Sequence, residues 1–175
     1  MRLFCARWAC IALLVAIPAR APASDLEDFE GTWVRVDRER EDAARYEEID
    51  RVTEGMSFVF RGFARGVMRR RMRPVERYVV ARSAEVASIR ADSGAEYPLD
   101  GRPHAGKEDQ QVTSWFTGEG EIEQSWRHGE ESHGTTVWRL DETGSRLVAS
   151  DRVYDPHFER PVEYSTSYER LAAEP

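Results

Sequence analysis

The second half of the chain alternates apolar and polar residues with a period of two, and turn-forming residues interrupt this alternation at regular intervals. Four such segments follow one another, at 110–117, 121–127, 134–140 and 146–154, with a glycine in the turn after each of the first three. Since successive side chains of a strand point to opposite faces, the pattern predicts antiparallel strands that each bury one face. Even spacing and short turns favour an up-and-down sheet that closes into a barrel. The alternative is an open sheet folded over a helix.

Further segments with the same period complete the predicted sheet, which then has eight or nine strands. They are 32–37, 77–82, 85–90, 96–99 and 162–171. Asp100-Gly101 is a strong turn signal, and residues 103–107 are predicted to form a loop. The predicted fold is therefore mainly β: an antiparallel up-and-down barrel of 8–9 strands, with one helical insert after the first strand.

Residues of about 39–73 form the helical insert. Apolar side chains recur there in steps of three and four between Tyr46 and Val67, which is the period of an amphipathic helix. Asp42 is a candidate N-cap, and Pro74 prevents the helix from continuing. Glycine lowers helix stability, so we expect a bend or break near Gly55 that divides the segment into two helices.

Residues 1–23 are predicted to be a cleavable export signal. Arg2 and Arg7 precede an apolar run of nine residues, 9–17, which is too short to span a bilayer. The A-x-A site at 21–23 predicts that the mature protein begins at Ser24, with 19–21 as a second site; the alternative is an uncleaved anchor. The sequence thus predicts an exported protein, periplasmic or secreted, with a single domain over 24–175.

Charge and cysteine content narrow the class of protein further. The chain has 25 basic and 32 acidic residues and a net charge of −7, which argues against nucleic acid as the partner of the domain. No second segment is long and apolar enough to predict a stable membrane span. Both cysteines, Cys5 and Cys10, lie in the predicted signal, so packing and not disulfides must hold the mature domain together.

The tripeptide Gly31-Thr32-Trp33, at the head of the first predicted strand, resembles the opening of lipocalin-like (calycin) barrels. The turn at 97–101 (YPLDG), the rhythm of aromatic residues and glycine turns over 115–147 and the helical segment 49–65 are similar to small exported bacterial members of unassigned function. The resemblance implies a barrel whose closed end is sealed by Trp33 under an arginine of the last strand, here Arg170. The chain departs from typical lipocalins because its helix follows the first strand instead of the barrel.

Strand parity predicts which side chains line the barrel, and several of them suit a small-molecule site. The candidate ligand-binding residues are Gln124, Trp126, Trp138, Asp151, Tyr164 and Tyr168. The alternative is that these side chains fill a narrow barrel completely. Asp151 is the only acidic residue among them, and it either fixes a donor group of a ligand or forms a structural pair.

Two other groups of side chains are candidates for a site. Arg61, Arg65, Arg69 and Arg73 recur every fourth residue; Arg61 and Arg65 are candidates for binding the head group of a ligand at the barrel mouth, and the alternative is a solvated helix face. His128 and His133 flank one hairpin but do not supply the three or four ligands of a zinc site. We therefore predict no metal, no cofactor and no catalytic residue.

Three functions remain open from the sequence. The first is an exported protein that binds a small hydrophobic molecule in the barrel. The second is a non-catalytic interaction or scaffold protein of the envelope. The third is an enzyme that uses the barrel cavity on an apolar substrate, for which Asp151 is the titratable group that can be named.

Overall fold

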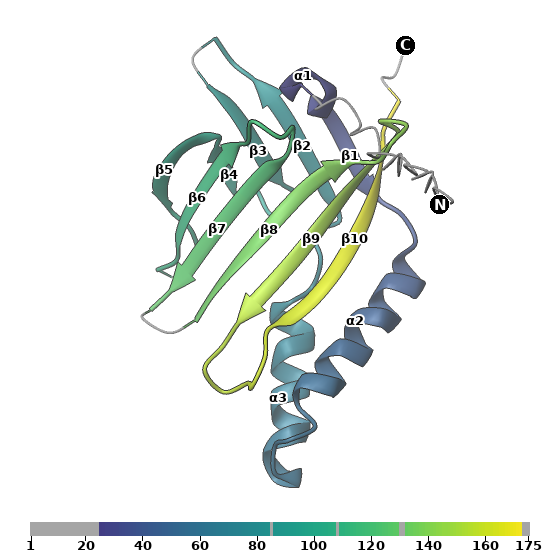
Figure 1. Cartoon of the computed structure of the whole chain (residues 1–175), viewed down its shortest axis with the longest axis vertical. Helices are drawn as coiled ribbons and strands as arrows, with labels where there is room; N and C mark the ends of the chain where they lie inside the picture. Colours follow the sequence, from purple (N-terminus) through teal and green to yellow (C-terminus); the bar gives the residue numbers. More distant parts are fainter. Residues whose placement is uncertain (1–24, 85, 108, 130–131, 173–175) are drawn as a thin grey trace, which may run out of the picture.

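The structure, a computed structural model, describes residues 25–84, 86–107, 109–129 and 132–172. Its strands form one antiparallel sheet in the order β4-β3-β2-β1-β10-β9-β8-β7-β6-β5 (Figure 1). Contacts between β4 and β6 bring the two margins of the sheet together, so the barrel is nearly closed. The strands are β1 (Gly31–Arg35), β2 (Arg77–Arg82), β3 (Ala87–Ala91), β4 (Glu96–Pro98), β5 (Asp100–Ala105), β6 (Gln111–Phe116), β7 (Ile122–His128), β8 (Ser132–Leu140), β9 (Arg146–Tyr154) and β10 (Val162–Arg170).

The described residues contain ten strands, where the sequence predicted eight or nine. The additional strand is β5, whose residues 103–105 belong to the segment 103–107 that was predicted to be a loop. Proline has no N–H to donate, but an edge strand leaves half of its N–H groups unpaired, so β5 can hold Pro103 at the margin of the sheet. Gly101 supplies the expected turn with φ of +71°, and a bulge separates it from the regular pairing of β5 with β6.

The helical insert consists of two helices, α2 (Arg38–Val52) and α3 (Phe58–Arg71), with the predicted break at Gly55 between them. The N-cap position of α2 is Asp37 and not Asp42, because the helix begins closer to β1 than the apolar period indicates. Asp42 instead accepts hydrogen bonds from Arg35 and Arg45. A short helix that the sequence did not predict, α1 (Leu26–Phe29), precedes β1.

Two apolar clusters occupy the two ends of the barrel. The first, at the end covered by α1, is built on Phe29, Trp33, Ile122, Trp138 and Leu147, all at most 1% exposed. The second lies where α2 and α3 pack against β9 and β10, and it includes Ile49, Val52, Met68, Met72 and Val162. The hairpin of α2 and α3 extends from this second end, opposite α1 (Figure 1). We call these the closed end and the helical end.

Among the described residues, no helix has the length and apolar character required to cross a bilayer. The predicted export signal, 1–23, lies outside the described residues, so its cleavage and the location of the protein stay predictions.

Candidate ligand-binding site inside the barrel

Trp33 lies at the closed end of the barrel, beside Arg170. The Trp33 indole is fully buried and donates a hydrogen bond from Nε1 to the carbonyl oxygen of Phe29, at 2.8 Å. Arg170 is the cross-strand partner of Trp33, and its guanidinium carbon lies 4.6 Å from the centre of the Trp33 ring. Such a cation–π contact stabilises by about 0.5–2 kcal/mol. Arg170 also donates to the carbonyl oxygen of Asp28, which ties α1 to the last strand.

One step further into the barrel, polar side chains form a row across strands β6 to β10. Ser114, Gln124, Thr136, Asp151 and Tyr164 are successive cross-strand partners in that order. They share the parity of the buried residues Ile122, Trp138 and Ala149, so they face the inside of the barrel. We call this row the polar layer.

The hydrogen bonds within the polar layer do not use all of its hydrogen-bond acceptors. Gln124 Nε2 donates to Ser114 Oγ at 3.0 Å, and Thr136 Oγ1 donates to Asp151 Oδ1 at 2.6 Å. The Asp151 carboxylate can accept several hydrogen bonds, and no other donor to it is found among the described residues. The Asp151 carboxylate can therefore accept a further hydrogen bond from a group inside the barrel.

The inner face becomes more accessible from the closed end to the polar layer. Trp138 and Ala149 are 1% exposed. Asp151, next but one to Ala149 along β9, and Gln124, next but one to the fully buried Ile122 along β7, are only half-buried. Trp126, one layer further toward the helical end, is also half-buried. The closed end is thus packed. Gln124, Asp151 and Tyr164 of the polar layer and Trp126 beyond it keep part of their surface accessible, whereas Ser114 and Thr136 are buried.

Burial changes the acid–base behaviour of this layer. Asp151 lies inside the barrel, and its desolvation there raises its pKa from 3.8 to about 6, against the opposing effect of the Thr136 hydrogen bond. No ion pair with Asp151 is found in the described part of the chain. A carboxyl group with this pKa changes its charge close to neutral pH and either accepts from a ligand or donates to it.

Three tyrosine side chains lie near enough to Asp151 for its charge to act on them. Burial raises the pKa of Tyr78, Tyr164 and Tyr168, and the charge of Asp151 adds to the rise in each case. Tyr168 donates its hydroxyl to the carbonyl oxygen of Val75, and its ring packs edge-on against that of Tyr78 at 5.2 Å. These phenols stay neutral and give Asp151 aromatic neighbours, although the charges of Arg35 and Arg45 also act on Tyr164.

The structure brings together four of the predicted site residues, Gln124, Trp126, Asp151 and Tyr164, at neighbouring positions of the sheet. Trp138 and Tyr168 also point inward, but they belong to the packed cluster of the closed end. Ser114, Thr136 and Tyr78 were not among the predicted ligand-binding residues. Parity identifies Thr136 as inward-facing, whereas the proximity of Tyr78 depends on closure of the sheet through β1.

Arg61 and Arg65 lie elsewhere, on the hairpin. Arg61 donates to the carbonyl oxygens of Glu54 and Met56 in the turn before α3. Arg65 pairs with Asp50 of α2 at 3.0 Å and donates to Thr53. In this structure both arginines connect α3 to α2 and its turn, and they do not approach the polar layer.

A groove of about 580 Å³ lies outside the barrel, between α2 and strands β9 and β10. Its walls are mainly charged, with Glu47, Glu48 and Arg51 on one side and Arg152 and Glu163 on the other. Tyr164 is the one predicted site residue that contacts it. Walls that carry both positive and negative side chains do not match an apolar ligand. The inner face of the barrel is therefore the better candidate site.

In the described ranges, no group of three or more His, Cys, Asp or Glu side chains comes together in a way that could hold a metal ion. No family model matches the chain, and no curated protein matches it.

Proposed function

We propose that this chain is an exported, lipocalin-like protein that binds a small, mainly apolar molecule inside its barrel. The observation that carries the proposal is the change in burial along the inner face, from the buried closed end to the half-buried side chains of Gln124, Trp126 and Asp151. A site of this kind, apolar and aromatic with few polar groups, is typical of proteins that bind small molecules.

The surroundings of Asp151 narrow the chemistry of the ligand. The aromatic rings of Trp126, Tyr78 and Tyr164 offer contacts to an apolar body, and the free acceptor capacity of Asp151 offers one hydrogen-bonding anchor. We therefore favour an amphiphile with a hydroxyl or amino group over a pure hydrocarbon, since an unpaired buried carboxyl group is costly. An anionic head group is disfavoured above the pKa of Asp151, because like charges would then meet.

Tryptophan fluorescence, to which Trp126 contributes, tests the site. Titration with fatty alcohols, fatty acids and quinones should quench tryptophan emission and reach saturation for at least one class. Substitution Gly134→Ala is the sharpest perturbation, because an added Cβ there would lie 2.6 Å from the Trp126 ring and force the indole to shift. We expect this variant to bind the quenching ligand at least ~tenfold more weakly, a loss of ~1.4 kcal/mol.

Thr135→Ala is the matched control, because Thr135 is the next residue of β8 and is exposed on the outer face. It should bind as the unchanged protein does. Absence of quenching across the panel, or equal loss of binding in both variants, would contradict a site inside the barrel.

A second candidate function is an enzyme that moves a proton on an apolar substrate in the same place. What favours it is the position of Asp151, which is inside the barrel and has a pKa of about 6, a value suited to acid–base work near neutral pH. Asp151→Asn separates the two functions: it would preserve the binding of neutral ligands in a carrier and abolish turnover in an enzyme.

A further inference from the structure

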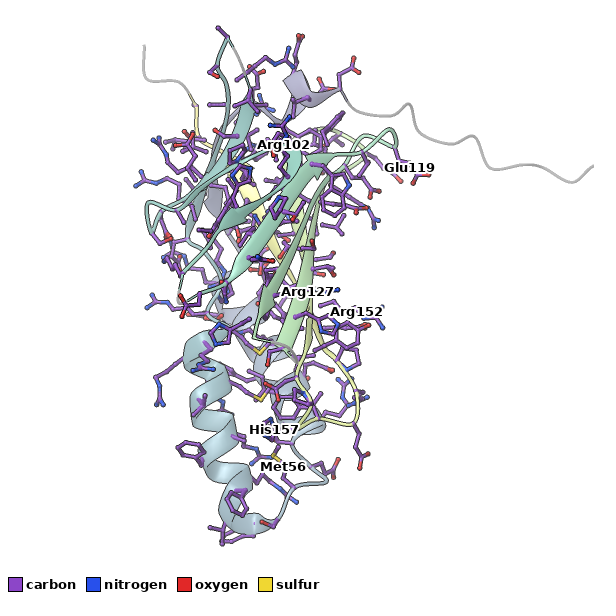
Figure 2. The ribbon with its side chains drawn as sticks, turned by 90° about the vertical axis from the view of Figure 1, so that its left-hand side faces the viewer. Met56, Arg102, Glu119, Arg127, Arg152 and His157 are labelled. Atoms are coloured by element: carbon purple, nitrogen blue, oxygen red, sulfur yellow. The ribbon has the colours of Figure 1, made fainter. Side chains whose placement is uncertain are left out.

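The first two turns of α3 expose an unusual amount of apolar surface. Phe58, Val59, Phe60 and Phe63 are between 69% and 89% exposed, and they are four of the five large apolar side chains that are exposed in the described residues. They lie beside the turn that joins α2 to α3, at the far tip of the hairpin. Figure 2 shows this tip at the end of the molecule marked by Met56, away from Arg102 and Glu119 of the barrel. A cluster of exposed aromatic residues indicates an interaction surface.

The charge of this segment is opposite to that of the rest of the protein. Residues 57–73 contain six arginines and no acidic residue, although the whole chain has a net charge of −7. Arg61, Arg65 and Arg69 contact α2 or its turn. Arg70, Arg71 and Arg73 are exposed, and within the described chain no acidic partner is found for them. The helix therefore presents free positive charge beside free apolar surface.

The helical period places these two features on one side of α3. At 100° per residue, Val59, Phe63 and Arg70 project within about 40° of one another, opposite the residues that contact α2. Gly62 is exposed and nothing lies within 4 Å of the position of its Cβ, so no other part of the protein covers α3 there. Arg70 follows Phe63 by seven residues, which is about 10 Å along the axis. The outer side of α3 thus changes from apolar at the tip to basic near the barrel.

We propose that α3 docks the protein on the surface of an anionic phospholipid bilayer. The aromatic tip enters the boundary between head groups and acyl chains, a zone about 5–10 Å deep, and the arginines of the last turn contact lipid phosphates. The long stems of Arg70 and Arg71 allow their guanidinium groups to stay at the phosphate level. The docking holds the helical end of the barrel toward the bilayer, and it does not depend on a ligand in the barrel.

A bilayer fits this surface better than a second copy of the chain does. Two copies joined through α3 would bring Arg70, Arg71 and Arg73 of one against the same three arginines of the other, with no acidic residue in 57–73 of either copy to compensate. Anionic lipids supply the missing negative charge, at about 1 kcal/mol of attraction for each basic residue near the surface. The fluid boundary region also accepts aromatic side chains without a shaped pocket.

Co-sedimentation with vesicles tests the proposal. The purified protein, with the N-terminus that the host produces, is mixed with vesicles of phosphatidylglycerol and phosphatidylcholine in equal parts, and separately with phosphatidylcholine alone. We expect binding to the anionic vesicles only, weakened by added salt. Two double variants, Phe60→Ser with Phe63→Ser and Arg70→Glu with Arg71→Glu, should each bind at least ~tenfold more weakly.

Matched controls keep the result specific to α3. Leu171→Ser removes an exposed apolar side chain outside the hairpin, and Arg102→Glu with Arg127→Glu makes the same change of charge on the barrel (Figure 2). Both should bind as the unchanged protein does, and every variant shares the same N-terminus. Equal binding by the α3 variants and the controls, or no binding to anionic vesicles, would overturn the proposal. So would light scattering that shows a dimer converted to a monomer by Phe60→Ser with Phe63→Ser.

Discussion

The two ends of the molecule use the same residue types in opposite ways. At the closed end, Phe29 and Trp33 are fully buried, and Arg170 stacks on the indole and donates to a carbonyl oxygen. At the helical end, Phe58 and Phe63 face solvent, and Arg70 has no acidic partner in the described chain. Aromatic residues beside arginines therefore stabilise the fold at one end and remain available for binding at the other. The contacts distinguish the two roles, and the composition does not.

The largest expected effect is at the closed end. Trp33→Ala removes the most central side chain of that cluster and leaves a cavity, which should lower the free energy of unfolding by about 3–5 kcal/mol. Urea unfolding followed by circular dichroism measures the change. A loss below ~1 kcal/mol would show that the closed end is not tightly packed. The two ends would then not differ in how they use their aromatic residues.

Asp151, between the two ends, should make stability depend on pH. Its folded pKa of about 6 exceeds the ordinary 3.8, so the folded state binds the proton more tightly and loses stability as pH rises through 6. Asp151→Asn removes this loss. The variant should be more stable than the unchanged protein by up to about 3 kcal/mol at pH 8, since a tenfold change in proton affinity corresponds to ~1.4 kcal/mol.

The same comparison at acid pH supplies the control for Asp151. The difference between the two proteins should shrink as pH falls from 6 toward 4, where the carboxyl group is protonated in both states. A difference that stays constant over this range would mean that Asp151 is not desolvated inside the barrel.

A smaller effect, of opposite sign to that of Trp33→Ala, is expected in α3. Gly62 is exposed within the helix and has open space around its Cβ position, so Gly62→Ala should raise the free energy of unfolding by about 1 kcal/mol. Gly94→Ala is the matched case, because it also has open space but a φ of +81°, and it should destabilise instead. Thermal unfolding of both variants checks the signs, and a stabilising Gly94→Ala would contradict the reasoning.

The smallest expected effect is at the tip of α3. Phe63→Ser should change the free energy of unfolding by less than about 0.5 kcal/mol, because the side chain is 72% exposed. Phe29→Ser, the same substitution at the closed end, should cost several kcal/mol, because it creates a cavity and buries a hydroxyl group. Comparable losses in both variants would show that the tip of α3 is packed against the protein in solution.

Local sequence patterns were sufficient to predict most of the sheet and the broken helix. Strands β2 and β9 have the predicted bounds, and the break near Gly55 is present. The inward parity of Ile122, Trp138 and Ala149 also agrees with their burial. The pattern succeeds in these segments because each has one buried face, so the period of two is visible in the residue types.

The features that the sequence could not predict depend on contacts between distant segments. β5 forms only because β6 offers it a partner, in spite of Pro103. Tyr78 meets Tyr168 and Trp138 because β1 joins the first and last parts of the sheet. The pairing of Arg65 with Asp50 follows from the folding of α3 back on α2. The four-residue spacing of the arginines indicated one shared helix face but not what that face would contact.

Native mass spectrometry of the protein isolated from its natural source tests the binding of a small molecule in the barrel most directly. We predict one additional mass of a small organic molecule, released by solvent extraction, that is depleted in Gly134→Ala and retained in Thr135→Ala. The bare mass of the polypeptide in every preparation, together with no quenching of Trp126 by any ligand class, would contradict it.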